Sequence, residues 1–157
     1  MLYAGIDLGG TNIKGGLYGD GKVLIKDEIK TGSLDAVSVI KNIAVIINKM
    51  LSDAGLKIND ITAIGAGIPG MIESSSGTVL YNNNLGWVKV EFAWLLQQEL
   101  KKDIPVYISN DANVAALGES VFGAAKEYKD SILITLGTGV GSGVIINGNI
   151  FEGNKGA

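Results

Sequence analysis

Glycine-rich turns between apolar runs occur near both ends of this chain, and their repetition is the strongest constraint on its fold. Near the N-terminus, an apolar run at 2–6 leads into a turn at 9–11 and then into a second strand-like run. The same order of strand, glycine–threonine turn, strand and glycine turn returns at 131–151. A recurrence of this kind indicates two copies of one β-hairpin unit.

Each turn has the chemistry of a phosphate-binding site. Glycines let backbone N–H groups approach a ligand closely, and consecutive inward-facing N–H groups hold anions. In the first turn Thr11 adds a hydroxyl, and Asp7 adds a carboxylate that can hold Mg²⁺, directly or through water. The candidate phosphate-binding residues are Asp7, Gly9, Gly10, Thr11, Asn12, Lys14, Gly137, Thr138 and Gly139.

Two such turns facing each other would grip a triphosphate from both sides, and this favours the phosphate interpretation over a pair of ordinary hairpins. Neither turn fits the glycine–lysine pattern of P-loop NTPases, which excludes that class. Lys14 shares a strand face with Asn12. It either reaches a phosphate or is simply solvated.

A second polar pair lies where a strand is expected to meet a helix. Asn110 and Asp111 follow the strand predicted at 106–109 and precede the helix predicted at 114–122. In open α/β sheets, ligands bind beyond such strand ends. Asn and Asp are also the preferred helix caps. We therefore expect one of the pair to cap the helix and the other to face a cleft.

Two loops carry features that suit a sugar. Gly70 follows Pro69 at the end of the strand predicted at 61–67, where the loop either lines a ligand cleft or is a plain turn. Asn84 is the last of three asparagines close to Trp87. Amide groups beside an apolar platform suit a polyhydroxylated ligand, although asparagines are also ordinary turn residues and the tryptophan can belong to the core.

Composition removes several classes of function. The 157 residues include no histidine and no cysteine, so acid–base chemistry has to use carboxylates, lysines or tyrosines. The net charge of −3 provides no basic surface for nucleic acid. No apolar run reaches the length of a membrane span, and no leader sequence is evident. We expect a cytoplasmic protein without nucleic-acid or membrane partners.

The order of elements predicts an α/β fold with a mixed sheet covered by helices. Three hairpin-linked strands come first, and strands then alternate with helices. The first helix is expected at 34–54, capped by Ser33. We expect one domain at 1–125 and, at 126–157, the first strands of a second, truncated copy.

Four segments together resemble the ROK family (repressors, open reading frames and kinases), whose kinase members phosphorylate sugars. The segments are 7–11, 84–87, 110–113 and 136–141. The resemblance covers the whole chain but only about the first half of a typical member. It implies the actin-like ATPase fold, which is ribonuclease H-like, with ATP and Mg²⁺ as cofactors and a homodimer for the full-length protein. Zinc is implied only if the missing half supplies its ligands.

The resemblance also implies roles for single residues. Asp7 would lie near Mg²⁺ and Thr11 near the ATP phosphates, while 137–141 would be the second phosphate motif. Asp111 resembles the catalytic base of the family. Asn12 stands where members often carry lysine. The implied sugar-binding residues are Gly70, Asn84, Asn110 and Asp111.

The function expected from this resemblance is ATP-dependent phosphorylation of a hexose or a related sugar, with Asp111 as general base. The fragment alone is expected to be inactive. One alternative is a sugar-sensing ROK transcriptional regulator that lacks its DNA-binding segment. Others are a different actin-like enzyme and a non-catalytic binding module. The sequence leaves the identity of the sugar open.

Overall fold

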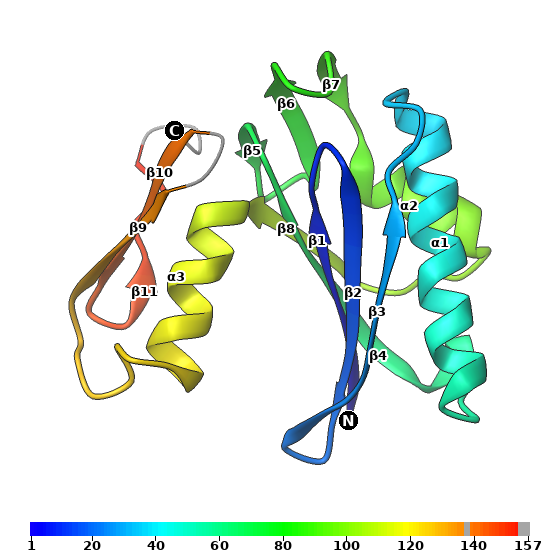
Figure 1. The fold of residues 1–157 in the computed structure, drawn as a ribbon, viewed down its shortest axis with the longest axis horizontal. Helices are drawn as coiled ribbons and strands as arrows, with labels where there is room; N and C mark the ends of the chain where they lie inside the picture. The colour runs from blue at the N-terminus through cyan, green and yellow to red at the C-terminus, as the bar shows by residue number, and fades with distance from the viewer. Residues whose placement is uncertain (137–138, 154–157) are drawn as a thin grey trace.

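The computed structural model describes residues 1–136 and 139–153, which form an α/β structure (Figure 1). Its helices are α1 (Ala36–Asp53), α2 (Phe92–Leu100) and α3 (Asp111–Phe122), with a short 3₁₀ turn at Ile58–Asp60. Its strands are β1 (Leu2–Leu8), β2 (Asn12–Gly19), β3 (Lys22–Lys30), β4 (Ile61–Ile68), β5 (Met71–Glu73), β6 (Thr78–Asn82), β7 (Trp87–Val90), β8 (Val106–Asn110), β9 (Ser131–Leu136), β10 (Val140–Ile146) and β11 (Asn149–Ile150).

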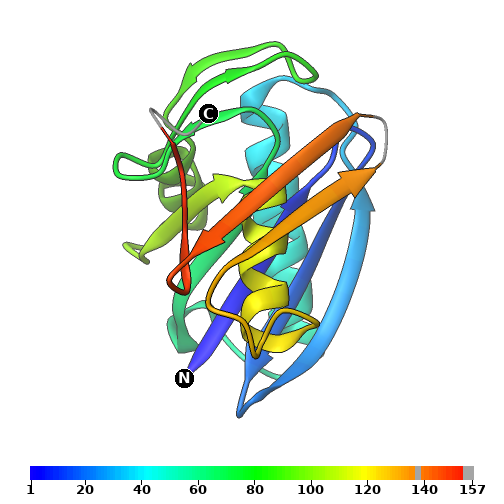
Figure 2. The same cartoon turned by 90° about the vertical axis from the view of Figure 1, so that its left-hand side faces the viewer.

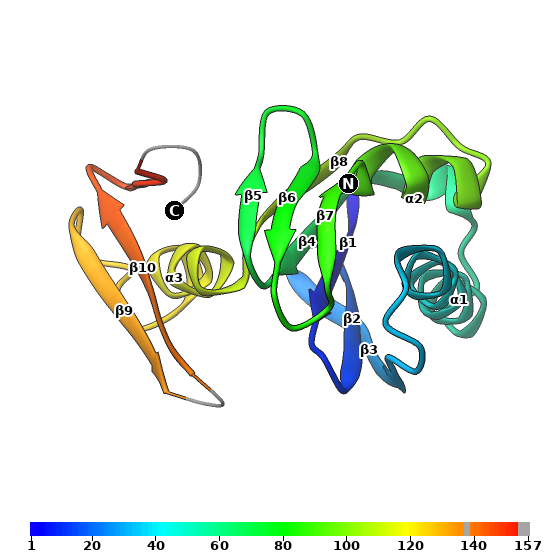
Figure 3. The same cartoon turned by 90° about the horizontal axis from the view of Figure 1, so that it is seen from above.

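The main sheet has five strands in the order β3-β2-β1-β4-β8. The first three strands form an antiparallel meander, and β4 and β8 extend the sheet in parallel with β1. This confirms the predicted mixed sheet. Two further antiparallel sheets, β5-β6-β7 and β11-β10-β9, lie apart from it. The second of these lies on the far side of α3 (Figure 3).

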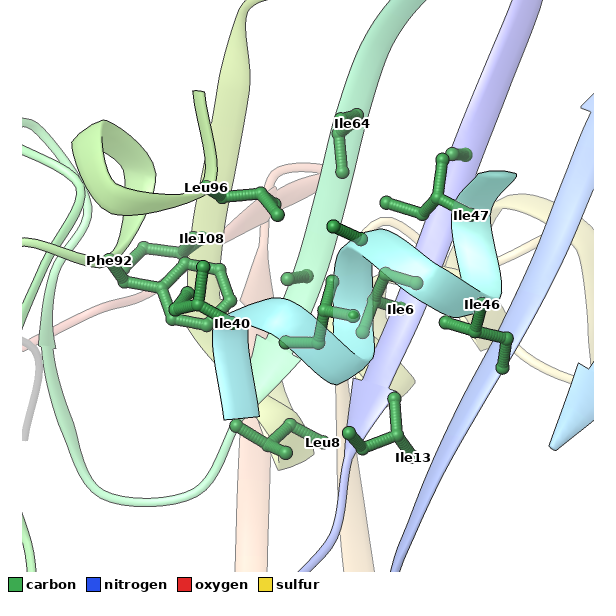
Figure 4. Packing of buried hydrophobic residues seen from close by; sticks show 14 of the residues in the cluster. Ile6, Leu8, Ile13, Ile40, Ile46, Ile47, Ile64, Phe92, Leu96 and Ile108 are labelled. Atoms are coloured by element: carbon green, nitrogen blue, oxygen red, sulfur yellow. The ribbon is translucent and has the colours of Figure 1, made fainter. Parts of the chain in front are cut away.

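The core lies between the main sheet and the helices α1 and α2 (Figures 3 and 4). Residues alternate along β1, so that Ala4, Ile6 and Leu8 are buried while the residues between them face the other side. Helix α1 contributes Ile46 and Ile47, both fully buried. Because burial of such side chains supplies most of the stability of a small domain, this layer stabilises the main sheet.

Helix α1 begins later than expected, because Asp35 rather than Ser33 caps it. The Asp35 carboxylate accepts a hydrogen bond of 2.9 Å from the Ser38 amide, and Ser33 donates its hydroxyl to the same carboxylate at 2.6 Å. These hydrogen bonds lower the pKa of Asp35 to about 2, and the one from the Ser33 hydroxyl has the largest effect, ahead of the one from the Ser38 amide. Ser33 therefore supports the cap and does not form it.

The hairpin β9–β10 packs on α3 through glycines (Figure 2). A Cβ at Gly143 would lie 2.5 Å from the carbonyl oxygen of Ala112 and 2.6 Å from the Cβ of Ala116. Only a residue without a side chain fits there. Part of the second glycine-rich segment thus serves close packing of a strand on a helix.

Candidate functional site

Three parallel strands end at one edge of the main sheet and bring the two predicted carboxylates together. Asp7 at the end of β1 pairs with Gly67 of β4, which pairs in turn with Ser109 of β8. A Cβ at Gly67 would lie 3.4 Å from the Cα of Asp111, the first residue of α3. Because neighbouring strands are spaced by about 5 Å, the Cα atoms of Asp7 and Asp111 lie within roughly 10 Å of each other. Both are exposed.

The first glycine turn is held in place by Thr31, the residue that follows β3. The buried Thr31 donates its hydroxyl to the Gly9 carbonyl at 2.7 Å, and its amide donates to the Thr11 carbonyl at 2.9 Å. The Gly9 amide donates to the Asn12 carbonyl at 2.9 Å, so this N–H belongs to the hairpin and is not free for a ligand. Gly10 and Thr11 are exposed, and a Cβ at Gly10 would meet open space. No motif or spacing in the sequence points to Thr31.

Lys14 lies on the same face as Asp7, with a carboxylate on each side. It pairs with Asp7 across β1–β2 and with Glu28 across β2–β3. Within residues 1–136 and 139–153 its ammonium forms no ion pair with either carboxylate. The lysine is exposed, and it lies beside the edge where Asp7 and Asp111 meet.

Next to Asp7, a cavity of about 590 Å³ covers the face of the main sheet that is turned away from α1. Its floor is nearly free of side chains, since Gly16, Gly5 and Gly65 lie side by side across β2, β1 and β4. Lys14 also lines this cavity. Of the predicted phosphate-binding residues, Asp7 and Lys14 therefore border an open hollow.

The Pro-Gly loop adopts a conformation that requires glycine. Gly70 has a φ of +110°, and a side chain there would collide with the backbone of Tyr81. The buried Asn82 donates to the Pro69 carbonyl at 2.5 Å and accepts from the Leu85 amide at 2.9 Å. Of the three asparagines, Asn82 therefore ties the two loops together, a role that sequence reasoning missed.

The structure places the other residues of these loops differently. Asn84 is exposed and lies outside the lining of the cavity that contains Gly70. Trp87 is buried and donates its ring N–H to the Leu34 carbonyl at 2.7 Å. Of the two alternatives that the sequence left open for Trp87, an apolar platform beside the asparagines or a core residue, the structure therefore shows the second.

Asn110 caps α3, as expected for one member of the pair. Its side-chain oxygen accepts from the Ala112 amide at 3.0 Å, and its side-chain NH₂ donates to the Gly70 carbonyl at 3.1 Å. Gly70 and Asn110 line one cavity of about 410 Å³, together with Asn113, Ser142 and Glu152. Asp111 also bonds the Ala112 amide, at 3.0 Å, and its carboxylate stays exposed.

The second turn is only partly visible. Gly137 and Thr138 lie outside the described residues, while Gly139 is exposed with open space around it. In the part of the chain that the structure describes, no three acidic side chains gather into a metal site. The residues still fit Mg²⁺, which is commonly held by one or two carboxylates and completes its shell with phosphates and water. No helix in the described ranges is long and apolar enough to cross a membrane.

Comparison with known proteins gives a consistent result. The model of the ROK family matches residues 3–157. A glucokinase of Halalkalibacterium halodurans is 43% identical over 156 residues, which are 98% of this chain and 47% of that protein. A xylose repressor of Caldicellulosiruptor bescii is 38% identical over 138 residues, which are 87% of this chain and 34% of that protein. The chain thus spans less than half the length of these relatives.

Among solved structures, a ROK family glucokinase from Streptomyces griseus in complex with glucose and AMPPNP superposes with a TM-score of 0.88 at 32% identity. The match covers 99% of this chain and 48% of that one. A ROK hexokinase from Thermus thermophilus gives a TM-score of 0.84 at 31% identity, over 99% and 50% of the two chains. The fold is that of the actin-like ATPases, as the sequence predicted, and the chain belongs to the ROK family.

Proposed function

We propose that these residues form one side of the cleft of an ATP-dependent kinase that phosphorylates a hexose or a related sugar. One observation carries the proposal: Asp7 and Asp111 flank Gly67 at the same sheet edge. A kinase of this kind needs one carboxylate near the phosphates and another beside the attacking hydroxyl. The glucokinase relatives support the same reaction type.

In this proposal Asp111 orients the sugar hydroxyl and accepts its proton during transfer of the phosphoryl group. An exposed carboxylate is a weak base, so positioning at the start of α3 contributes more than basicity. Gly10, Thr11 and the second turn, 137–139, bind the phosphates through backbone N–H and hydroxyl groups. Mg²⁺ held by Asp7 would neutralise charge on the phosphates.

The sugar lies in the cavity of about 410 Å³ beside Gly70 and Asn110. Asn84 lies outside the lining of this cavity, and Lys14 lines the other hollow, beside Asp7. In this proposal Asn84 reaches the sugar and Lys14 the phosphates only when both ligands are bound. The resemblance further supports a cytoplasmic homodimer for the full-length protein, with no nucleic acid, no membrane and with zinc only from ligands outside this chain. We also propose that the 157 residues alone are inactive, because the kinase relatives are about twice as long.

A second candidate is a sugar-responsive transcriptional regulator. The observation in its favour is the match to xylose repressors, at 38% identity for one of them. Such a protein would bind the sugar in the same cavity and transfer no phosphate. The two candidates therefore differ in turnover and not in sugar binding.

The test is a coupled ATPase assay of the full-length gene product across hexoses, N-acetylated hexoses and xylose. Asp111→Asn should lower turnover about 10²–10⁴-fold, the usual contribution of a general base. Asp103→Asn, an exposed carboxylate after α2, is the matched control and should leave turnover unchanged. Full turnover in Asp111→Asn would remove this residue from the role. Sugar binding without any turnover in the wild type would favour the regulator.

A further inference from the structure

We propose that Asn42 is a positioning residue for ATP binding, because it holds the threonine that in turn holds the first glycine turn. Asn42 belongs to α1 and lines neither of the two cavities described above. The inference rests on the proposed function, in which Gly10 and Thr11 bind the phosphates. It adds a residue that acts on the phosphates through Thr31 and not by contact.

Thr31 joins the turn to α1 through three hydrogen bonds. Its hydroxyl donates to the Gly9 carbonyl at 2.7 Å, and its amide donates to the Thr11 carbonyl at 2.9 Å. The Thr31 carbonyl accepts a hydrogen bond of 2.9 Å from the side-chain NH₂ of Asn42. The first two bonds fix the turn relative to Thr31, and the third fixes Thr31 relative to α1.

The chain leaves the main sheet at Thr31, so the sheet alone does not fix this residue. The pairing of β3 with β2 ends at Lys30, which lies opposite Asn12. Gly32 has a φ of +72°, a left-handed conformation that turns the chain away from the direction of the strand. Thr31 is fully buried. A buried carbonyl requires a hydrogen-bond partner, and the Asn42 side chain provides one where the strand pairing has ended.

Helix α1 is a rigid support for this bond. Asn42 is half-buried, and the neighbouring Ile43 is fully buried, as are Ile46 and Ile47 on the same helix. These isoleucines belong to the core between α1 and the main sheet (Figure 4). A group that extends from a packed helix is held more precisely than one on a loop. The packing of α1 on the sheet therefore sets the position of Thr31, and with it that of the turn.

The turn binds phosphate well only if its N–H and hydroxyl groups already point toward one place. Gly10 and Thr11 are exposed, and the two bonds from Thr31 act on either side of Gly10. Without Asn42, the turn would be ordered fully only when phosphate binds. Part of the binding free energy then goes into ordering the turn, which weakens the affinity for ATP.

The sugar cavity is formed by other parts of the chain. Its described lining residues lie at 70–71, 110–113 and 141–152, and none of them belongs to α1. A change at Asn42 should therefore weaken the binding of ATP and leave that of the sugar unchanged. A residue that only stabilised the fold would affect both ligands alike.

The experiment uses the full-length gene product and replaces Asn42 with leucine, which has a similar shape and cannot donate a hydrogen bond. Binding of the ATP analogue AMPPNP with Mg²⁺ is measured by calorimetry, and the KM values for ATP and sugar by coupled assay. Asn42→Leu should raise the Kd of AMPPNP and the KM for ATP about three- to tenfold, with the KM for the sugar unchanged. Asn42→Gln, which can still donate, should recover part of the loss.

Two further variants of α1 serve as controls. Asn48→Leu makes the same replacement at an exposed position and should leave both KM values unchanged. Ala44→Gly weakens the helix at a buried position and should lower Tm without raising the KM for ATP. Combining Asn42→Leu with Thr31→Val should raise the KM for ATP by less than the product of the two single effects, because both act through the contacts of Thr31.

If the wild type binds AMPPNP but Asn42→Leu keeps the same Kd, or if Ala44→Gly raises the Kd as much, this inference alone is overturned. Fully multiplicative effects in the double variant would overturn it as well. Binding of AMPPNP without phosphorylation of any sugar would overturn the proposed kinase activity, and the Kd values would still decide the inference. If calorimetry finds no AMPPNP bound by the wild type, the proposed function and the inference are both overturned.

Discussion

The two hairpins that follow the same glycine-rich pattern have different surroundings. In β1–β2, the face that carries Ile6 is covered by α1, and that residue is 4% exposed. In β9–β10, the face that carries Gly143 packs on α3, while the opposite face exposes Ile134 at 62% and Leu136 at 81%. A strand–turn–strand pattern thus specifies the hairpin. The neighbouring helix decides which of its faces becomes core.

The turns themselves also differ. The last strand pair before the first turn is Leu8 with Ile13, whereas before the second turn it is Leu136 with Val140. The second connection is therefore one residue shorter. A shift of one residue in pairing exchanges the two faces of a strand. The repeat seen in the sequence is consequently a repeat of topology and not of side-chain environment.

The largest expected difference between the hairpins comes from a matched pair of substitutions. Ile6→Ala should lower the free energy of unfolding by about 2–5 kcal/mol, because it leaves a cavity against α1. Ile134→Ala removes the same atoms from an exposed site and should change it by less than about 0.5 kcal/mol. Urea unfolding of the 157-residue chain measures both. Equal losses would mean that the second hairpin is as well covered as the first.

Glycine packing gives the next largest effect. Gly143→Ala should cost about 1–3 kcal/mol of unfolding free energy, because the new methyl group meets the backbone of Ala112 and the side chain of Ala116. Gly139→Ala lies in the same segment with open space around it and serves as the control. Thermal unfolding followed by circular dichroism compares the two. A neutral Gly143→Ala would show that β10 does not pack tightly on α3.

A smaller effect is expected at the threonine that holds the first turn. Thr31→Val keeps the shape of the side chain but removes the hydrogen bond to Gly9, and should cost about 0.5–1.5 kcal/mol of unfolding free energy. In the full-length gene product it should also raise the KM for ATP. Thr62→Val, at an exposed position of β4, is the control. An unchanged KM for ATP would show that nucleotide binding does not depend on the hydrogen bond that holds this turn.

The smallest effect concerns the caps of the two covering helices, since α1 has the charged cap Asp35 and α3 the neutral cap Asn110. The pKa of Asp35 is lowered from 3.8 to about 2, first by the Ser33 hydroxyl. Its stabilising contribution is therefore present above pH 3.8 and is lost as pH falls through 2. Protection of the backbone amides against exchange, relative to the intrinsic rate at each pH, should fall between pH 4 and pH 2 more at the start of α1 than at the start of α3. Asp35→Asn should remove this difference.

Much of the fold followed from periodicity and turn chemistry. The strands at the N-terminus, the mixed sheet and the helix at 34–54 are all present, apart from a shift of about two residues where Asp35 took the cap from Ser33. The start of α3 was expected at residue 114 but lies at Asp111. Several neighbouring polar residues can cap a helix, and the local backbone geometry decides which of them does. The sequence alone therefore did not identify the residue that caps α1.

The candidate site was predictable only where a motif points directly at a strand end. Asp7 and Asp111 were named from their positions, and the parallel strands bring them to one edge. Thr31 and Asn82 were missed because each acts through contacts with residues distant in sequence. The sequence left Trp87 open between a platform and a core residue, because burial of a ring depends on tertiary packing, here with a hydrogen bond to the Leu34 carbonyl.

The bond between Thr31 and Gly9 joins residues that are 22 positions apart. The length of the intervening hairpin β2–β3 therefore determines which residue lies opposite Gly9. Removing one residue at its tip, Asp20-Gly21, would bring Gly32 opposite Gly9, and adding one would bring Lys30. Neither of these residues carries a hydroxyl. Homologues and engineered chimaeras that keep this turn should accordingly inherit the whole hairpin with its length unchanged.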